Sequence, residues 1–445
     1  MRDPSFPRPD EGGANCVPVH TSDSHDPMRG RRSFLQRGGA GLAAVIANGA
    51  AGSAWAAAPA AAQANAIKLS LIQDPDAEQK EETPDANLRP DGRIGYAIVG
   101  LGRLSLNQIL PALLTSKYSK VAALVSGDRV KALKIAHQYG APETSIYDYQ
   151  DFERLGDNPR VQVVYVVLPN AMHREYTERA RIGKHVLCEK PMATSVPDCE
   201  AMVAACKSAN RKLMIAYRSQ YEPMDRMIAN MVKENKLGAL RDFVAGNSQN
   251  VGDPTQWRLK LALAGGGPMP DVGVYCLNAA RFISGEEPYE AVASTARLHD
   301  DPRFTEVESS VHFVLRFPSS FTAPCMASYA GHESRFFRVQ GPKGWVEMNP
   351  AFSYNGLRLR HGMLADGRNA ATEIIIDRVD QFAREIDHMS RRVIDDKMPH
   401  TPGEEGLQDQ RIIEAIYESA RTGRAVKIAK PPGPTRGPEP EEETF

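Results

Sequence analysis

The sequence predicts two folded domains: an N-terminal α/β domain with a doubly wound parallel sheet, and a C-terminal α+β domain whose sheet is largely antiparallel. Three observations carry this prediction. An apolar run over 94–99 leads into a glycine turn and then into an apolar helical pattern. Strand-like and helix-like segments then alternate as far as about residue 220. Beyond residue 238, strands of alternating polar and apolar character follow one another with few helices between them.

The turn after the first strand has the pattern of a dinucleotide-binding site. Gly100 permits a tight turn, Gly102 lets a pyrophosphate approach the backbone, and Ser105 is small enough for the helix to lie on the strand. Free N–H groups and the helix dipole would face the phosphates at this point. We therefore expect a Rossmann-type domain over 93–220. Its turn residues Gly100, Gly102, Arg103, Leu104 and Ser105 are expected to bind the cofactor.

The residue after the second strand bears on which cofactor binds. An NAD enzyme usually places an acid at this position to bind the ribose hydroxyls, but here Ser126 follows the strand 121–125, with Lys131 nearby. A small uncharged residue backed by a cation favours a 2′-phosphate and hence NADP. Asp128 is the counter-evidence, although it stands two positions late.

Two further strand ends carry candidate site residues, because ligands bind beyond the carboxyl ends of parallel strands. Pro169 and Asn170 follow the strand 161–168, and Asn170 would also serve as a helix cap. Lys190 follows the strand 185–188 and precedes a proline, which favours an extended backbone there. We expect Lys190 to point into the cofactor crevice.

The second domain is expected over 221–428, and one early helix carries its candidate residues. Asp271 and Tyr275 are four positions apart and so share a helical face. They would otherwise be a capping acid and a core tyrosine. The triple glycine 265–267 allows a close approach of a neighbour or ligand.

Strands are expected over 242–246, 289–296, 309–317, 327–329, 335–340 and 345–348. Late helices are expected over 377–394 and 404–421, one of them packing on the first domain.

The first 66 residues resemble an export signal. Arg31 and Arg32 precede a Gly/Ala-rich apolar stretch, which is typical of the twin-arginine route, and Met28 is an alternative start. Gly, Ser, Asn and Pro interrupt that stretch, so we expect no stable membrane insertion. The pattern predicts that the twin-arginine export machinery carries the folded protein to the periplasm.

Composition narrows the remaining possibilities. With 445 residues and a net charge of −1, the chain shows no basic excess that would call for nucleic acid. Six cysteines, one of them in the leader, show neither a CxxC pair nor zinc spacing, so we expect reduced thiols and no metal. Residues 67–92 are expected to form an extended arm, and the proline-rich stretch 429–445 a disordered acidic tail.

The motifs together resemble the glucose–fructose oxidoreductase family of the sugar and inositol dehydrogenase superfamily. GYAIVGLG, LPNAMH, GKHVLCEKPMATSV, QWRL and GGGxxxDVGVY occur in that order, and the resemblance covers about 95–428. It implies sugar substrates, a tightly but non-covalently bound NADP, and a homo-oligomer, either dimer or tetramer. It also implies a catalytic pair, Lys190 and Tyr275, supported by Asp271. The cofactor would be lined by Asn170, His173, Glu189, Lys190, Arg218, Trp257 and Arg258.

The resemblance also implies a mechanism. Tyr275 would be the general base for a sugar hydroxyl, and the Lys190 ammonium would favour its phenolate form. The expected reaction couples oxidation of glucose to gluconolactone with reduction of fructose to sorbitol. Two alternatives remain open. One is a conventional NAD(P)-dependent sugar dehydrogenase that exchanges its cofactor. The other is an NAD-dependent glycoside hydrolase of this fold, which would have a histidine where Tyr275 stands.

Overall fold

The computed structural model describes residues 92–440, except 181 and 366. The predicted leader, and all but the last residue of the predicted arm, lie outside the described residues. In the described part of the chain, no helix combines the length and the apolar character that crossing a bilayer requires. The five cysteines of this part are buried, and none of them forms a disulfide bond there.

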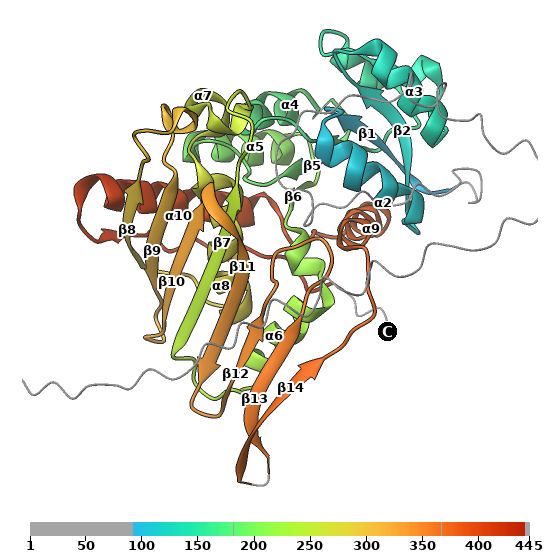
Figure 1. The fold of residues 1–445 in the computed structure, drawn as a ribbon. Coiled ribbons are helices and arrows are strands. Elements are labelled where there is room, and N and C mark those ends of the chain that lie inside the picture. The colour runs from blue at the N-terminus through green and yellow to red at the C-terminus, as the bar shows by residue number, and fades with distance from the viewer. Residues whose placement is uncertain (1–91, 181, 366, 441–445) are drawn as a thin grey trace, which may run out of the picture. The chain divides into compact units, whose positions relative to one another are not determined.

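The first domain contains the predicted parallel sheet, with strand order β3-β2-β1-β4-β5-β6 (Figure 1). Every neighbouring pair of strands in it is parallel. The order reverses between β1 and β4, and ligands of such sheets bind at this switch point. The strands are β1 (Ile94–Val99), β2 (Ser119–Val125), β3 (Ile146–Tyr147), β4 (Val163–Val166), β5 (His185–Glu189) and β6 (Leu213–Ala216).

Helices cover both faces of this sheet because side chains along each buried strand alternate between the faces. Tyr96 and Ile98 of β1 belong to a core shared with α2, α3 and α9. Ala97 and Val99 belong to a second core shared with α4, α5 and α10. The prediction that one late helix packs on the first domain is confirmed, because α9 contacts α2 and β2. The helices are α2 (Leu110–Thr115), α3 (Arg129–Tyr139), α4 (His173–Ala180), α5 (Val196–Ser208), α9 (Gln381–Ile394) and α10 (Gly403–Thr422).

The second domain has a sheet of order β14-β13-β12-β11-β7-β10-β9-β8-β15, in which only β7 and β10 pair in parallel. The predicted, largely antiparallel sheet is therefore present. Its strands are β7 (Asp242–Asn250), β8 (Glu290–Ala296), β9 (Ser310–Arg316), β10 (Thr322–Ser328), β11 (Ala330–Gly341), β12 (Gly344–Met348), β13 (Leu359–Ala365), β14 (Arg368–Ile374) and β15 (Val426–Lys427). The sequence did not predict the β13–β14 hairpin, because β14 is exposed along almost its whole length and shows no apolar alternation.

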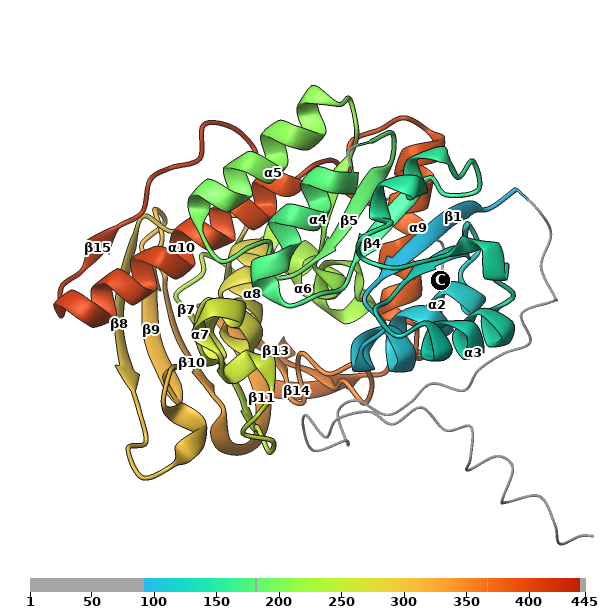
Figure 2. The same cartoon turned by 90° about the horizontal axis from the view of Figure 1, so that it is seen from above.

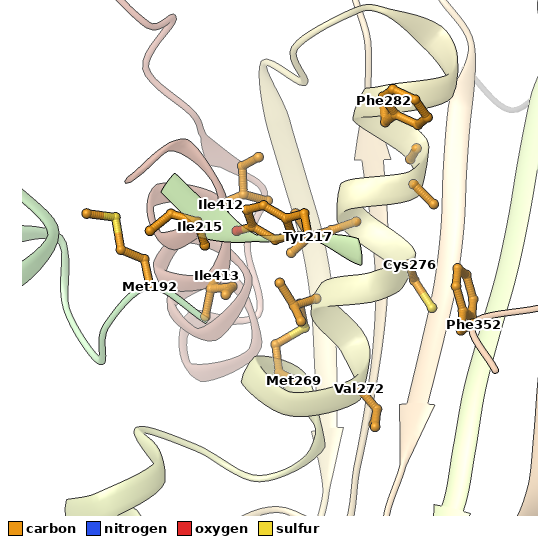
Figure 3. Close-up of a cluster of buried hydrophobic side chains, with 14 of the residues drawn as sticks. Met192, Ile215, Tyr217, Met269, Val272, Cys276, Phe282, Phe352, Ile412 and Ile413 are labelled. Carbon is orange, nitrogen blue, oxygen red and sulfur yellow. The ribbon is translucent and has the colours of Figure 1, made fainter. Parts of the chain in front are cut away.

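A shared core joins the two sheets and fixes the position of the site between them. Figure 3 shows Met192 and Ile215 of the first domain, Met269 and Cys276 of the second, and side chains of α10 gathered in one buried cluster. The remaining helices of this region are α6 (Pro223–Lys233), α7 (Leu261–Ala264) and α8 (Val274–Ser284). Seen from above, α10 runs beside α5, so it bridges the first sheet and β8 (Figure 2).

The prediction of a disordered tail over 429–445 is wrong for residues 429–440, which belong to the described part of the chain. Thr435 is buried and donates a hydrogen bond to Glu287 (3.1 Å). Arg436 donates to the Arg281 carbonyl (3.1 Å), and the Gly437 N–H donates to the His400 carbonyl (2.9 Å). Proline-rich composition indicated disorder, but these polar groups find partners in a buried cluster that the sequence does not reveal. Residues 441–445 lie outside the described residues.

Candidate active site

A cavity of about 500 Å³ lies at the carboxyl ends of the parallel strands and extends to the second sheet. Its volume is within the range of small-molecule sites, roughly 300–1,000 Å³. All predicted site residues line it except Ser105 and His173. The predicted residues that line it are Gly100, Gly102, Arg103, Leu104, Ser126, Lys131, Pro169, Asn170, Glu189, Lys190, Arg218, Trp257, Arg258, Asp271 and Tyr275.

The glycine turn fits a dinucleotide. Gly100 has a φ of +95°, and a Cβ on it would lie 2.3 Å from the Val167 carbonyl oxygen, so only glycine is tolerated. A Cβ on Gly102 would meet nothing within 4 Å, which leaves the backbone open toward the cavity. The helical segment that continues into α2 begins at this point, so its N–H groups are available to a pyrophosphate.

Ser105 and His173 support the cavity from behind instead of lining it. The Ser105 hydroxyl is fully buried and donates to the Gly100 carbonyl at 2.6 Å, which holds the turn closed. The two ring nitrogens of His173 lie 2.8 Å from the Leu168 carbonyl and 2.9 Å from the Pro191 carbonyl. Burial lowers the pKa of His173. This imidazole therefore connects the loops after β4 and β5, and it does not itself line the cavity.

The end of β2 places Ser126, Asp128 and Lys131 together on the cavity wall. The Asp128 carboxylate accepts the Lys131 N–H at 2.9 Å and so caps α3. The Asp128 N–H donates to the Ser126 hydroxyl at 3.1 Å. The acid that argued against NADP in the sequence therefore has a structural role at the start of α3, which leaves the Lys131 side chain as the neighbouring cation.

Lys190, Asp271 and Tyr275 come together in the wall of the cavity. The Lys190 ammonium donates to the Asp271 carbonyl (2.8 Å) and carboxylate (3.2 Å). It lies 4.6 Å from the centre of the Tyr275 ring, a cation–π distance. Burial lowers the pKa of Lys190, but the neighbouring Tyr275 and Asp271 outweigh burial and raise the pKa above its usual value. Lys190 is therefore an ammonium at neutral pH.

Asp271 is a fixed anion at the centre of this cluster. Its carboxylate accepts from Arg258 (3.1 Å) and from the Tyr329 hydroxyl (2.7 Å) as well as from Lys190. Burial raises the pKa of Asp271, but the charges of Arg258 and Lys190 outweigh burial and hold the pKa well below its usual range. Asp271 therefore orients the two cations and remains charged.

The triple glycine before this cluster serves packing within the chain. A Cβ on Gly266 would lie 2.0 Å from the Tyr417 hydroxyl, and one on Gly267 would lie 2.4 Å from the Glu308 carbonyl oxygen. The Tyr417 hydroxyl donates to the Glu308 carboxylate at 2.7 Å. The glycines thus let the segment before Asp271 lie against α10 and against the loop that leads into β9.

Arg218 and Glu189 flank the cluster. Arg218 donates to the Phe352 carbonyl (2.6 Å) and to Gln381 (2.5 Å), and its guanidinium carbon lies 4.9 Å from the centre of the Tyr275 ring. The buried Glu189 carboxylate accepts from the Tyr165 hydroxyl at 2.8 Å, and burial raises its pKa. Arg218 therefore connects the wall around Tyr275 to α9.

Sequence patterns did not indicate the part of the cavity wall that the second sheet contributes. Asn247 and Gln249 of β7 and Arg335 of β11 line it, together with Phe352 and Tyr354. Asn247 and Gln249 are two positions apart, so they share a face of β7, but they belong to a run of polar residues over 247–250 that lies beyond the predicted strand 242–246. Their contact with the cavity depends on the sheet register, which local patterns do not define.

A nucleotide-binding turn that faces a lysine–tyrosine pair defines a dinucleotide-dependent oxidoreductase class, and known proteins agree. Residues 94–217 match the model of the oxidoreductase family with an NAD-binding Rossmann fold, and 226–347 match the GFO/IDH/MocA C-terminal domain. A D-xylose 1-dehydrogenase [NADP(+)] of Haloarcula marismortui is 32% identical over 348 residues, which are 76% of this chain and 94% of that protein. The chain belongs to the GFO/IDH/MocA oxidoreductase family.

Solved structures agree with this assignment. Aldose-aldose oxidoreductase from Caulobacter crescentus, complexed with glycerol, is 47% identical with a TM-score of 0.73, and the match covers 76% of this chain and all of that one. Levoglucosan dehydrogenase, in complex with NADH and L-sorbose, superimposes with a TM-score of 0.68 at 19% identity, over 76% of this chain and 99% of that one. At that identity the second match supports the fold alone.

Proposed function

We propose that the protein is an NADP-dependent sugar oxidoreductase that couples the oxidation of one sugar to the reduction of another on a cofactor that stays bound. The observation that carries the proposal is the Lys190–Asp271–Tyr275 cluster beside an open glycine turn. The 32%-identical relative is named as an NADP-dependent xylose dehydrogenase, and the 47%-identical one as an aldose-aldose oxidoreductase. Glucose and fructose are the proposed first pair. The second candidate for the sugar that is reduced is an aldose, which the name aldose-aldose oxidoreductase of the 47%-identical relative supports.

Different residues of the cavity are proposed to transfer the proton, to supply positive charge and to bind the cofactor. Bound NADP would accept a hydride from one sugar carbon and return it to another. Tyr275 takes the hydroxyl proton of the sugar being oxidised and returns a proton to the carbonyl of the sugar being reduced. Lys190, held by Asp271, places a positive charge beside Tyr275 and would donate to the reacting oxygen. The phosphates of the cofactor would be held by Gly102, Ser126 and Lys131. Arg258 would line the cofactor site beside Asp271.

Retention of the cofactor follows from the proposed location. The paired arginines of the leader support twin-arginine export to the periplasm, where no NADP pool would replace a lost molecule. A cofactor that was reduced and could not leave must be reoxidised in place. A homo-oligomer that closes the site over the cofactor is part of the same proposal.

Turnover without added cofactor tests the proposal. We expect the purified protein to keep a nicotinamide absorbance after exhaustive dialysis, and glucose alone to reduce that cofactor once. Adding fructose should restore the oxidised form and yield sorbitol, with ping-pong kinetics as the second sugar is varied. Steady turnover that requires added NADP and ignores both fructose and aldose acceptors would instead identify a conventional dehydrogenase.

Cofactor preference is predicted to depend on Ser126. In a Ser126→Asp variant, the added carboxylate would repel a 2′-phosphate and could accept the ribose hydroxyls. We expect the ratio of NADP to NAD affinity to fall by about tenfold or more. A change of this size is what the repulsion between one pair of like charges in a partly buried site would cause. A Lys131→Ala variant should weaken NADP binding and spare NAD. Fluorescence titration of both cofactors measures the ratio. An unchanged preference in both variants would place 2′-phosphate recognition elsewhere.

A further inference from the structure

The wall of the cavity contributed by the second sheet is polar and almost completely buried. Asn247 and Gln249 share one face of β7, and Arg335 pairs with Asn247 across the strands, so all three side chains share that face. Their exposed fractions are 2%, 5% and 8%, and all three line the same cavity as Lys190 and Tyr275. Apolar residues would be the usual choice for such a buried sheet face.

The orientations of the two amides follow from their neighbours. Asn247 donates its Nδ2 to the Val272 carbonyl at 3.1 Å, which leaves Oδ1 as the remaining group. Gln249 accepts from Arg335 at 3.4 Å through Oε1, which leaves Nε2. Neither Asn247 Oδ1 nor Gln249 Nε2 has a hydrogen-bond partner within the described part of the chain. Buried polar atoms without partners are costly, so these two indicate a missing ligand.

The two remaining groups suit hydroxyls. One is an acceptor and the other a donor, and a sugar hydroxyl can serve both. The terminal torsions of Asn and Gln are broad, so each amide can turn toward a ligand without leaving its rotamer. Arg335 brings no free charge, because Glu333 contacts its guanidinium. A carboxylate would therefore lose its hydration in this wall without gaining an unpaired cation.

We propose that Asn247 and Gln249, braced by Arg335, recognise the hydroxyl groups that lie away from the reacting carbon, and thereby select neutral sugars. This inference rests on the proposed function, since it assigns the substrate side of the same cavity. Asn247 and Gln249 determine specificity here, whereas Lys190 and Tyr275 carry the proton chemistry. Uronic acids should be poor substrates for the same reason.

Sugar analogues test this assignment in the whole protein. With the wild-type enzyme, we expect at least one monodeoxy glucose to show a kcat/KM about 10- to 100-fold below that of glucose. The missing hydroxyl would leave a buried amide without a hydrogen-bond partner. In Asn247→Leu or Gln249→Leu, kcat/KM for glucose should fall by a similar factor. Discrimination against the matching deoxy sugar should disappear, while NADP affinity stays unchanged.

Controls separate this inference from the proposed function. Gln340→Leu removes another sheet amide, one bonded to Asp242 at 3.0 Å and absent from the cavity lining, and should leave the sugar profile unchanged. Gln249→Met keeps the length of the side chain without its amide, so it should fold if the leucine variant does not, and it should lose the same discrimination. Variants that retain full discrimination overturn the inference. If no sugar reduces the cofactor of the wild type, the proposed function fails. The inference is then decided by glucose binding, measured as the rise in melting temperature that glucose causes: this rise should be lost in the Gln249 variants, and its persistence there overturns the inference.

Discussion

Replacing Tyr275 by phenylalanine is expected to lower the single-turnover rate of cofactor reduction by about 10²- to 10⁴-fold, the usual contribution of one general base. The variant keeps the ring that Lys190 and Arg218 face at 4.6 and 4.9 Å, so the packing of the cavity should survive. Only the hydroxyl is lost, and with it the group that takes the substrate proton. Stopped-flow absorbance of the bound nicotinamide after mixing with glucose measures the rate.

The matched control for this variant is Tyr289→Phe. Tyr289 is 41% exposed and does not line the cavity, so loss of its hydroxyl should leave the rate unchanged. NADP affinity should be equal in the wild type and both variants. A Tyr275→Phe enzyme that reduces its cofactor at close to the wild-type rate would show that another group takes the proton.

Local signals were sufficient for most of the first domain. The glycine turn at Gly100 and the continuously apolar strands define a parallel sheet, because few other folds bury such strands on both faces. Because ligands bind where such strands end, Ser126, Pro169, Asn170 and Lys190 could be placed at one cavity from the sequence. Asp271 and Tyr275 followed from helical spacing and from family resemblance, and the fold brings both to Lys190.

What the sequence could not show depends on contacts between distant segments. Ser105 and His173 have the residue types of ligand-binding positions, but their burial, Ser105 behind the turn and His173 between two loops, is a property of the packed fold. Asn247 and Gln249 lie in a polar run without apolar alternation, and their place on the cavity wall depends on how β7 pairs with β10 and β11. The segment 429–440 is composed like a disordered tail, yet Thr435 and Arg436 bind partners more than a hundred residues earlier in the chain.

Those partners form a buried ionic cluster around Arg281, whose side chain is fully buried. Arg281 binds Glu287 and Glu405 at 2.8 Å and also contacts Asp409, so it ties α8, the helix that carries Tyr275, to α10. Burial raises the pKa of Glu405, but Arg281 and Arg436 outweigh burial and hold the pKa at about 2. In contrast, burial raises the pKa of Asp409 to about 7. Glu405 therefore stays charged at neutral pH, whereas Asp409 can take up a proton.

An Arg281→Met variant is accordingly expected to lose about 3–5 kcal/mol of unfolding free energy, because the Glu405 carboxylate remains buried without its main cation. Chemical denaturation at neutral pH measures the loss. Adding Glu405→Gln to the variant should recover part of it, since the amide carries no charge, although Gln220 and Asn278 also bind this side chain. Arg154→Met, which removes an exposed pair with Asp151, should have little effect. If the double variant is no more stable than Arg281→Met, lost packing and not an unpaired charge explains the destabilisation.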